Sequence, residues 1–292
     1  MMNVHNSPVC AALSGYGTES QKRRYLQPLA RGELFGAFLL TAPEAGSDAG
    51  ALKTRAVRNG DRYVINSVKQ FITSGRTADI AMILAVTNPE AGRKGITCFI
   101  TPTDNPGYVV VREEEKLGHR NCDTCQIVLQ DMEVPAADVL GALEGGYKIA
   151  LANLNSGRIG VAAQAVGVAR AALDHAVRYT RERSTFGKPI IEHQAVGFKL
   201  ADMATRVEAA HQLTLYAARL KDAGIPCLKE ASMAKLLASE VAEKVCSDAI
   251  QVHGGYGFLN DFPVEKLYRD ARVFQLYEGT NEVKELVICR GL

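Results

Sequence analysis

The stretch EGGYK (144–148) divides the sequence into two parts with different hydrophobic periods. Before it, short segments rich in β-branched and aromatic residues alternate with Gly, Asn, Asp and Pro, as in strands joined by turns. After it, apolar residues recur every three to four positions, which is the period of amphipathic helices. The switch predicts an α+β fold in which a β domain precedes a helical bundle.

Six segments of the first part have the composition of strands, and no helical pattern separates them. They are FGAFLLT (35–41), RYVINSVKQFIT (62–73), DIAMILAVT (79–87), GITCFIT (95–101), YVVVREE (108–114) and QIVLQDMEV (126–134). Strands at this spacing favour an antiparallel, barrel-like sheet over repeated strand–helix–strand units. We therefore expect a β domain over residues 35–143.

The second part contains three helical windows of roughly 25–35 residues. Their apolar positions are Val161, Ala165, Val168, Ala169, Ala172, Leu173, Ala176 and Val177, then Phe198, Ala201, Met203, Ala204 and Val207, then Met233, Leu236, Leu237, Val241 and Val245. Alanine allows helices to approach closely, and KDAGIPC (221–227) has the composition of a connection. The pattern predicts an antiparallel bundle of long helices over residues 144–292.

The first 34 residues contain one predicted helix, TESQKRRYLQPLARGE (18–33), with Thr18 as its N-cap. No helical partner for it is evident nearby in the sequence. Residues 1–34 therefore form a partial unit, which the resemblance given below implies is the remainder of an N-terminal helical domain that is mostly absent.

Composition excludes several classes of protein. The 292 residues carry a net charge of +2, and basic residues are interspersed with acidic ones, which argues against a nucleic-acid or membrane-surface partner. No apolar run could cross a bilayer, and the first residues lack the features of a secretion signal or transit peptide. The CxxC of Cys122 and Cys125 has no second pair or His cluster, so reduced thiols are favoured over a metal site. We expect a soluble, cytoplasmic protein.

Three glycine-bearing stretches each have a structural and a functional interpretation. TAPEAGSDAG (41–50) is either a simple turn or a loop whose small residues let a ligand approach the backbone. RSTFGKPI (183–190) is either a solvated helix end or a basic, hydroxyl-bearing corner suited to a diphosphate. QVHGGYGFLND (251–261) is either a crossover loop or backbone in contact with a flat ligand.

A fourth stretch, VFQLYEGTNEV (273–283), places Glu278 between an apolar run and the expected start of the last helix. A desolvated carboxylate is a stronger base than one in water. The unpaired amides of the helix N-terminus at Gly279 and Thr280 can donate to a carbonyl or a phosphate. This pairing suits proton abstraction beside an activated carbonyl, and the alternative is a Glu that only complements the helix dipole.

Together these stretches resemble the acyl-CoA dehydrogenase family, and most closely its short-chain, butyryl-CoA branch. The resemblance runs from about residue 3 to the end, through LLTAPEAGSDAG, NSVKQFITSG, KLGHRNCDTCQI, NSGRIGVAAQAVGVA, RERSTFGKPIIEHQAV, FKLADMAT, EASMAKLLASE, AIQVHGGYGF, YRDARV and YEGTNEV. It implies non-covalent FAD and the oxidation of a saturated acyl-CoA to the trans-2-enoyl-CoA. Glu278 would remove the α-proton while the β-hydrogen leaves as hydride to the flavin, and the Glu278 amide would help to hold the thioester oxygen.

The resemblance also implies the residues of the site. Beside the flavin it places Phe38, Leu40, Thr41, Gly46, Ser47, Phe71, Ile72 and Thr73, with Phe71 as the stacking face because the chain has no Trp. At a nucleotide site completed across a subunit boundary it places Arg183, Thr185, Phe186, His193, Gln194, Gln251, Gly254 and Gly255, and after the base it places Thr280 and Glu282. On the substrate side it places Ser47, Asn155, Arg158 and Gly279, with Arg158 helping to hold the CoA portion. Some branches place the base at the position of Gly157, which cannot serve, so Glu278 is the candidate.

The chain departs from the family pattern in two places. Thr41-Ala42-Pro43-Glu44 stands where Thr-Glu-Pro-Gly is usual, and roughly a hundred residues of the N-terminal helical domain are missing. The implied partners are an acyl-CoA, further copies of the chain in a dimer or tetramer, and an electron-transferring flavoprotein in fatty-acid β-oxidation. The alternatives are a non-catalytic remnant that acts as a subunit or binding module, and an enoyl-CoA reductase, because the same groups serve both directions.

Overall fold

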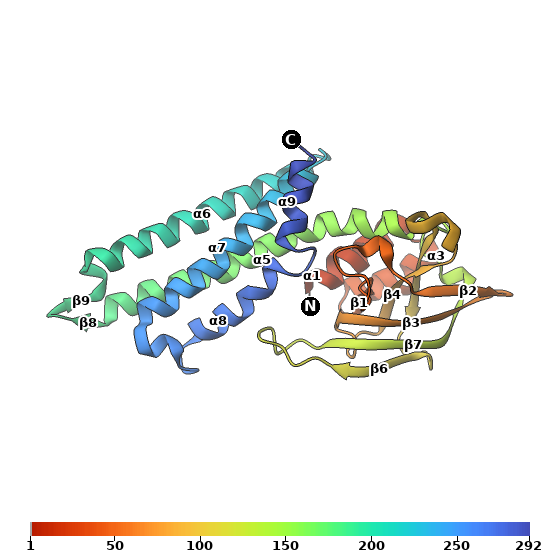
Figure 1. Ribbon diagram of the computed structural model, residues 1–292, viewed down its shortest axis with the longest axis horizontal. Helices are drawn as coiled ribbons and strands as arrows, with labels where there is room; N and C mark the ends of the chain where they lie inside the picture. Colours follow the sequence, from red (N-terminus) through yellow and green to blue (C-terminus); the bar gives the residue numbers. More distant parts are fainter. Residues whose placement is uncertain (1) are drawn as a thin grey trace. The chain divides into compact units, whose positions relative to one another are not determined.

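The computed structural model describes residues 2–292 and confirms the predicted fold class, a β domain followed by a bundle of long helices (Figure 1). The chain forms two compact units. The first contains the residues up to Lys116 together with Arg120–Gly157, and the second contains Leu117–His119 and Arg158–Leu292. The boundary falls within the helix α5 (Gly146–Glu182).

The first unit begins with two successive helical segments. The elements are α1 (Met2–Val4), η1 (His5–Cys10) and α2 (Ala11–Tyr16), then α3 (Glu19–Gln21), η2 (Lys22–Leu26) and α4 (Gln27–Ala30). Thr18 is the N-cap of the second segment, as predicted, and it forms a capping box with Gln21. The first segment was not predicted, because its short apolar stripe is interrupted by Pro8. Since Val9 and Leu13 share a core cluster with residues of the second segment, the expectation that this helix has no nearby partner is wrong.

Seven strands of the first unit form one mixed sheet. They are β1 (Gly36–Leu39), β2 (Arg55–Asn59), β3 (Arg62–Thr73), β4 (Ile80–Val86), β5 (Ile96–Pro102), β6 (Tyr108–Glu113) and β7 (Thr124–Pro135). The order is β1-β4-β2-β3-β7-β6, with β5 beside β4. All six predicted strands are present. Most pairs are antiparallel, but β4 is parallel to β1 and, through the pairing of Arg55 with Val86, to β2.

Both sides of the sheet are covered around β4. Met82 and Leu84 belong to one core cluster with the N-terminal helices, while Ile83 belongs to a second cluster with Phe99 and Ile127. This alternation follows from the two-residue period of a strand. The short helices η3 (Ala49–Ala51), η4 (Pro89–Gly95) and η5 (Ala136–Asp138) lie in the connections.

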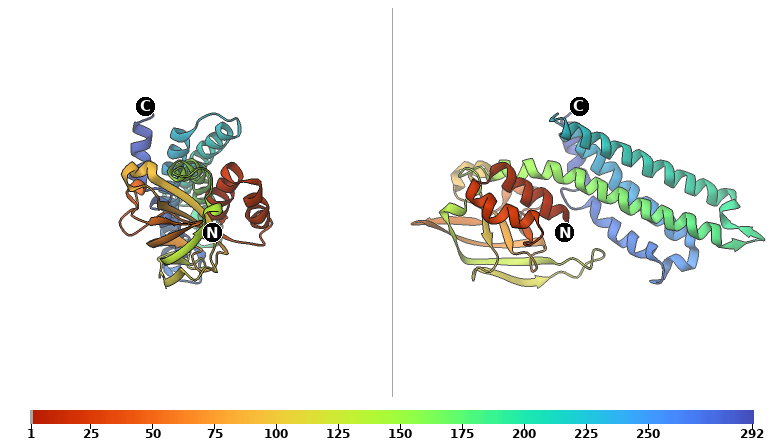
Figure 2. Two further views of the ribbon diagram at one scale, coloured as in Figure 1. Left: turned by 90° about the vertical axis from the view of Figure 1, so that its right-hand side faces the viewer. Right: turned by 180° about the vertical axis from the view of Figure 1, so that it is seen from behind.

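The second unit is a helical bundle in which α5, α6 and α7 run side by side (Figure 2). After α5 come β8 (Ser184–Thr185), β9 (Lys188–Pro189), η6 (Ile190–Glu192), α6 (Gln194–Asp222), α7 (Leu228–His253), η7 (Gly254–Phe258), α8 (Pro263–Ala271), η8 (Arg272–Gln275) and α9 (Asn281–Cys289). The predicted connection before residue 228 separates α6 from α7. Within residues 2–292, no helix combines the length and the apolar character that a bilayer crossing requires.

The bundle core contains many small residues, as the alanine pattern predicted, including Ala165, Ala169 and Ala238. The predicted inward positions of Phe198 and Met233 are wrong, because these side chains are 65% and 38% exposed. Ala201 and Ala204 are exposed as well. The buried face of α6 follows Leu200, Met203, Val207, Ala210, Thr214 and Ala217, and the buried face of α7 includes Ala231, Ala234, Ala238, Ala242 and Ala249.

Candidate active site

Glu278 lies in the turn between η8 and α9. Its φ is +54° and that of Gly279 is +86°, so two successive residues are in the left-handed region. A left-handed conformation is unfavourable for a residue with a side chain and is concentrated at functional sites. The turn is fixed on both sides, because the Tyr277 hydroxyl donates to Gln164 Oε1 at 2.9 Å and Thr280 Oγ1 accepts from Val283 N at 3.4 Å. Thr280 is therefore the N-cap of α9, and the last helix starts where the sequence predicts.

The carboxyl group of Glu278 is withdrawn from solvent. The residue as a whole is half-buried, but its Oε2 atom is fully buried and has no hydrogen-bond partner among the described residues. Burial raises the pKa of Glu278 to about 7, while the positive charges of Lys284, Arg158 and Lys235 act in the opposite direction. A carboxylate with a pKa near neutrality is matched to proton transfer at neutral pH.

Three cations from three helices act on this carboxyl group. Arg158 comes from α5, Lys235 from α7 and Lys284 from α9, and their exposed fractions are 6%, 0% and 0%. Burial lowers the pKa of Lys235 to about 8 and that of Lys284 to about 7. The arrangement balances two large effects on Glu278, since desolvation favours its neutral form and the neighbouring cations favour its ionised form.

Lys235 also fixes the backbone next to Glu278. Its Nζ donates to Gly279 O at 3.0 Å and to Asn281 Oδ1 at 2.8 Å. Ser239 Oγ donates to the same Asn281 oxygen at 3.1 Å. These bonds attach the turn and the first residue of α9 to α7. The turn is consequently held at the backbone of Gly279, directly after the carboxyl-bearing residue.

Arg158 was predicted as a site residue from the sequence, whereas Lys235 and Lys284 were not. The signal was available, because each lysine occupies a position where the helical period calls for an apolar residue. Ala231 and Ala238 are the buried positions before and after Lys235 on α7. A lysine on the buried face of a helix requires a partner or a function.

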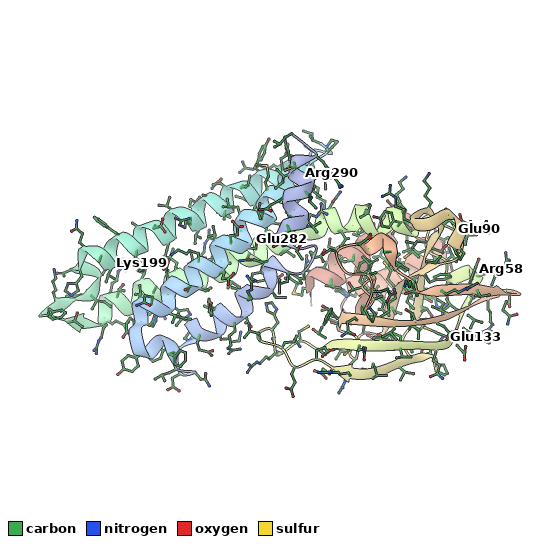
Figure 3. The ribbon with its side chains drawn as sticks, viewed as in Figure 1. Arg58, Glu90, Glu133, Lys199, Glu282 and Arg290 are labelled. Carbon is green, nitrogen blue, oxygen red and sulfur yellow. The ribbon has the colours of Figure 1, made fainter. Side chains whose placement is uncertain are left out.

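The predicted site residues that follow Glu278 in the chain lie at the surface or near it. Thr280 and Gly279 are half-buried, and Glu282 is exposed in the first turn of α9, where Figure 3 labels it. Hydrogen bonds with its own backbone amide and with Thr280 lower the pKa of Glu282. Glu282 is therefore an ionised surface group.

The predicted flavin-side residues of the first unit lie on two adjoining segments. Gln70 N donates to Thr41 O at 3.0 Å, which joins the segment around Phe71 to the loop after β1. Phe71 is 65% exposed and has a φ of +57°. The others divide by exposure, with Gly46 and Ser47 exposed, Phe38, Thr41 and Thr73 half-buried, and Leu40 and Ile72 buried. An exposed aromatic ring held in a left-handed backbone is suited to stacking on a planar ligand.

The predicted nucleotide-side residues of the second unit come together although they are far apart in the sequence. Arg183, Thr185, Gly254 and Gly255 line one open cleft of about 440 Å³. The rest of the lining is Tyr179, Ile190, Val252, His253, Tyr256 and Leu259. A cationic side chain, a hydroxyl group and two glycines in one cleft match the needs of a diphosphate.

The remaining residues of that set surround the β8–β9 turn or lie on its neighbouring helices. Thr185 Oγ1 and His193 Nε2 are 3.1 Å apart and within hydrogen-bonding distance. Phe186 is 96% exposed with a φ of +52°. Gln194 and Gln251 are exposed at the start of α6 and near the end of α7. Phe186 thus shares with Phe71 and Glu278 a left-handed backbone at a predicted site residue.

The residues just before Arg158 on α5 and the two cysteines of the CxxC have defined environments. Asn155 is half-buried and Gly157 is buried in the part of α5 that belongs to the first unit. Cys122 is half-buried, whereas Cys125 is buried and its Sγ donates to Asp123 Oδ2 at 3.5 Å. Over residues 2–292, no three His, Cys, Asp or Glu side chains are grouped to hold a metal ion.

Comparison with known families shows three matches along the chain. The acyl-CoA dehydrogenase N-terminal domain matches residues 1–33, the middle domain matches residues 37–132 and the C-terminal domain matches residues 144–292. The C-terminal match alone covers half of the chain. The protein belongs to the acyl-CoA dehydrogenase family of oxidoreductases, whose members use FAD.

Individual relatives agree with this assignment. An acyl-CoA dehydrogenase of Bacillus subtilis is 49% identical over 292 residues, which are 100% of this chain and 77% of the relative. A subunit of the caffeyl-CoA reductase–Etf complex of Acetobacterium woodii is 46% identical over 93% of this chain and 72% of its own. The structure of butyryl-CoA dehydrogenase from Megasphaera elsdenii superimposes with a TM-score of 0.98 at 44% identity, covering 99% of this chain and 76% of that one. The chain thus spans about three quarters of these relatives and is similar to short-chain members.

Proposed function

We propose that the protein catalyses the FAD-dependent α,β-dehydrogenation of a short-chain acyl-CoA to the trans-2-enoyl-CoA, with Glu278 as the base that takes the α-proton. The observation that carries this proposal is the state of Glu278. Its Oε2 atom is buried without a partner, and burial raises its pKa to about 7 beside three cations. A carboxylate that only complemented a helix dipole would lie in solvent.

The surroundings of Glu278 support proton abstraction next to a thioester carbonyl. The backbone amide of Glu278 is suited to donate to the thioester oxygen, and the nearby helix N-terminus favours the negative charge that develops there. Arg158 is proposed to contact the CoA ester, together with Ser47, Asn155 and Gly279. Lys235 keeps the turn in place through its bond to Gly279 O.

The residues present fit a bound FAD. The exposed ring of Phe71 offers a stacking face, with Phe38, Leu40, Thr41, Gly46, Ser47, Ile72 and Thr73 around it. The cleft lined by Arg183, Thr185, Gly254 and Gly255 suits a diphosphate. We assign the same nucleotide site Phe186, His193, Gln194, Gln251, Thr280 and Glu282. FAD, when bound, accepts the β-hydrogen as hydride.

We also propose the protein's partners. The nucleotide cleft is completed by a second copy of the chain in a dimer or tetramer, as the family resemblance implies. An electron-transferring flavoprotein is the acceptor in cytoplasmic fatty-acid oxidation, and the name of the Acetobacterium woodii relative, a subunit of a reductase–Etf complex, supports that partner. The same name favours a second candidate, the reduction of an enoyl-CoA. Anaerobic assays with an acyl-CoA and with an enoyl-CoA plus reduced flavoprotein distinguish the two directions.

Glu278→Gln tests the proposal. The full chain, reconstituted with FAD, is mixed anaerobically with butyryl-CoA, and flavin absorbance is followed in a stopped-flow instrument. Because a general base contributes typically about 10²–10⁴-fold, we expect the variant to keep its flavin and lose at least a hundredfold in the rate of bleaching. Glu285→Gln is the matched control, since Glu285 is an exposed acid on the same helix. Bleaching by Glu278→Gln at the wild-type rate would remove Glu278 from the mechanism.

A further inference from the structure

Lys284 is an unusual residue at this site. Its side chain is 0% exposed, and its Nζ has no hydrogen-bond partner among the described residues. A buried ammonium group without acceptors is strongly disfavoured, and buried lysines normally acquire them. Lys235, in the same cluster, follows the rule with two acceptors. The unmet hydrogen-bonding capacity of Lys284 therefore needs an explanation.

The Nζ of Lys284 lies against the Glu278–Gly279 turn. A Cβ atom on Gly279 would collide with Nζ, so the ammonium group occupies the space beside this backbone. Glu278 Oε2 is the complementary case, a buried acceptor without a donor. Two groups of opposite charge, each with a buried polar atom that has no hydrogen-bond partner among the described residues, thus belong to one turn and the helix that follows it.

We propose that Lys284 is a positioning residue for Glu278, whose carboxyl group it holds in the ionised form that accepts a proton. The inference rests on the proposed role of Glu278 as the base. The cations Arg158 of α5 and Lys235 of α7 act on both groups, and Glu278 is the one acid that acts on Lys284 in the described part of the chain. Glu282 and Glu240 act on Lys235 instead.

A purely structural role does not account for this lysine. An apolar side chain of similar length would fill the same space without the cost of desolvating a charge. Among the cations around Glu278, Lys284 acts most strongly to lower the pKa that burial raises. Lys284 therefore partly offsets the rise in the pKa of Glu278 that burial causes, and its own ammonium group loses its hydration.

The direct test is a titration of Glu278 in the full chain labelled with ¹³C at the glutamate carboxyl carbon. The Glu278 signal is identified by its loss in Glu278→Gln. In Lys284→Met we expect the midpoint of this titration to rise by about one pH unit, because the variant lacks a nearby opposite charge. Lys284→Arg keeps the charge and is expected to titrate near the wild type. A midpoint that does not move in Lys284→Met would overturn the inference.

The pH profile of flavin bleaching by butyryl-CoA gives an independent reading. The acidic limb of the profile is expected to shift upward in Lys284→Met, with a roughly tenfold loss of rate on that limb and recovery at higher pH. A structural defect would lower the rate equally at every pH. Lys284→Gln serves as a second uncharged variant if Lys284→Met does not fold, and Glu285→Gln is the control on the exposed face of α9.

The two proposals fail in different ways. If the wild-type chain with FAD is not bleached by any acyl-CoA, the proposed function fails, while the carboxyl titration still decides whether Lys284 controls the ionisation of Glu278. If the wild type is bleached and both the profile and the titration of Lys284→Met superimpose on those of the wild type, the role of Lys284 fails and the proposed function stands.

Discussion

Two buried lysines, one in each unit, show opposite ways of placing a charge inside a protein. Lys69 of β3 and Lys284 of α9 are both 0% exposed, and burial lowers the pKa of each to about 7. Lys69 donates to Leu40 O at 3.1 Å and to Leu84 O at 2.9 Å, whereas Lys284 has no hydrogen-bond partner in the part of the chain that the structure describes. Burial alone therefore does not mark a functional group, and Lys284 is distinguished by burial combined with unmet hydrogen bonds beside the buried carboxyl group of Glu278.

The surroundings of the two lysines explain the difference. Leu40 directly precedes the 41–50 loop and Leu84 lies in the middle of β4, so Lys69 connects two neighbouring parts of the sheet. Lys284 is instead close to an ionisable group, Glu278, which also has no hydrogen bond at Oε2. The first lysine completes a structure, and the second is placed to act on a reacting group.

The largest effect on stability is expected for Lys69→Met. The change removes the hydrogen-bond donor of two carbonyl groups, Leu40 O and Leu84 O. We therefore expect the free energy of unfolding to fall by about 3 kcal/mol. Urea denaturation of the full chain measures it. Lys53→Met, at an exposed lysine in the same unit, is the control and should lie within about 0.5 kcal/mol of the wild type. If the stability of Lys69→Met were unchanged, Lys69 would not have the structural role assigned to it here.

In contrast to Lys69→Met, Lys284→Met is expected to make the folded chain more stable. Removing a buried cation without acceptors should raise the free energy of unfolding by about 1–2 kcal/mol below pH 7. The folded pKa of Lys284 is about 7 against an ordinary value of 10.5, so between pH 7 and pH 10.5 the unfolded chain binds more protons than the folded chain. The cost of the lysine is then complete below pH 7 and disappears as the pH rises towards 10.5.

Thermal and urea unfolding at pH 6 and pH 9.5 check this prediction, with Lys284→Arg as the variant that retains the cost. A Lys284→Met chain that is less stable than the wild type at both pH values would show that Lys284 has a structural role like that of Lys69.

The smallest effect on stability is expected for Phe71→Ala, which extends the comparison to a residue that faces outward. Because the ring is 65% exposed, the free energy of unfolding should change by less than about 0.5 kcal/mol. The affinity for FAD should nevertheless fall by about tenfold, since loss of an aromatic stacking partner costs on the order of 1 kcal/mol or more. Fluorescence titration of the chain with FAD measures this affinity. Wild-type affinity in the variant would exclude Phe71 from the cofactor site.

The sequence predicts regular elements well where a period is long and uninterrupted. The 62–73 strand has the bounds of β3, and the three helical windows became α5, α6 and α7. The pattern missed β2, because RAVRN is charged and mostly exposed, and it placed Phe198 inward because period alone does not fix the direction of a helix face.

The candidate site was predictable in part. Glu278 stands out from the residues on either side of it in the chain. Lys235 and Lys284 are visible in the sequence only as charged residues at positions where the helical period calls for apolar ones, and their significance depends on α7 and α9 bringing them to the same carboxyl group. That convergence is a property of packing between helices and has no counterpart in local sequence.

The most direct measurement of the central claim is the exchange of the α-hydrogens of butyryl-CoA in D₂O, followed by mass spectrometry of the recovered thioester. The FAD-loaded wild-type chain is predicted to incorporate deuterium at carbon 2, and Glu278→Gln to incorporate none above the level without protein. Deuterium incorporation by Glu278→Gln at the wild-type rate would contradict the assignment of Glu278 as the base.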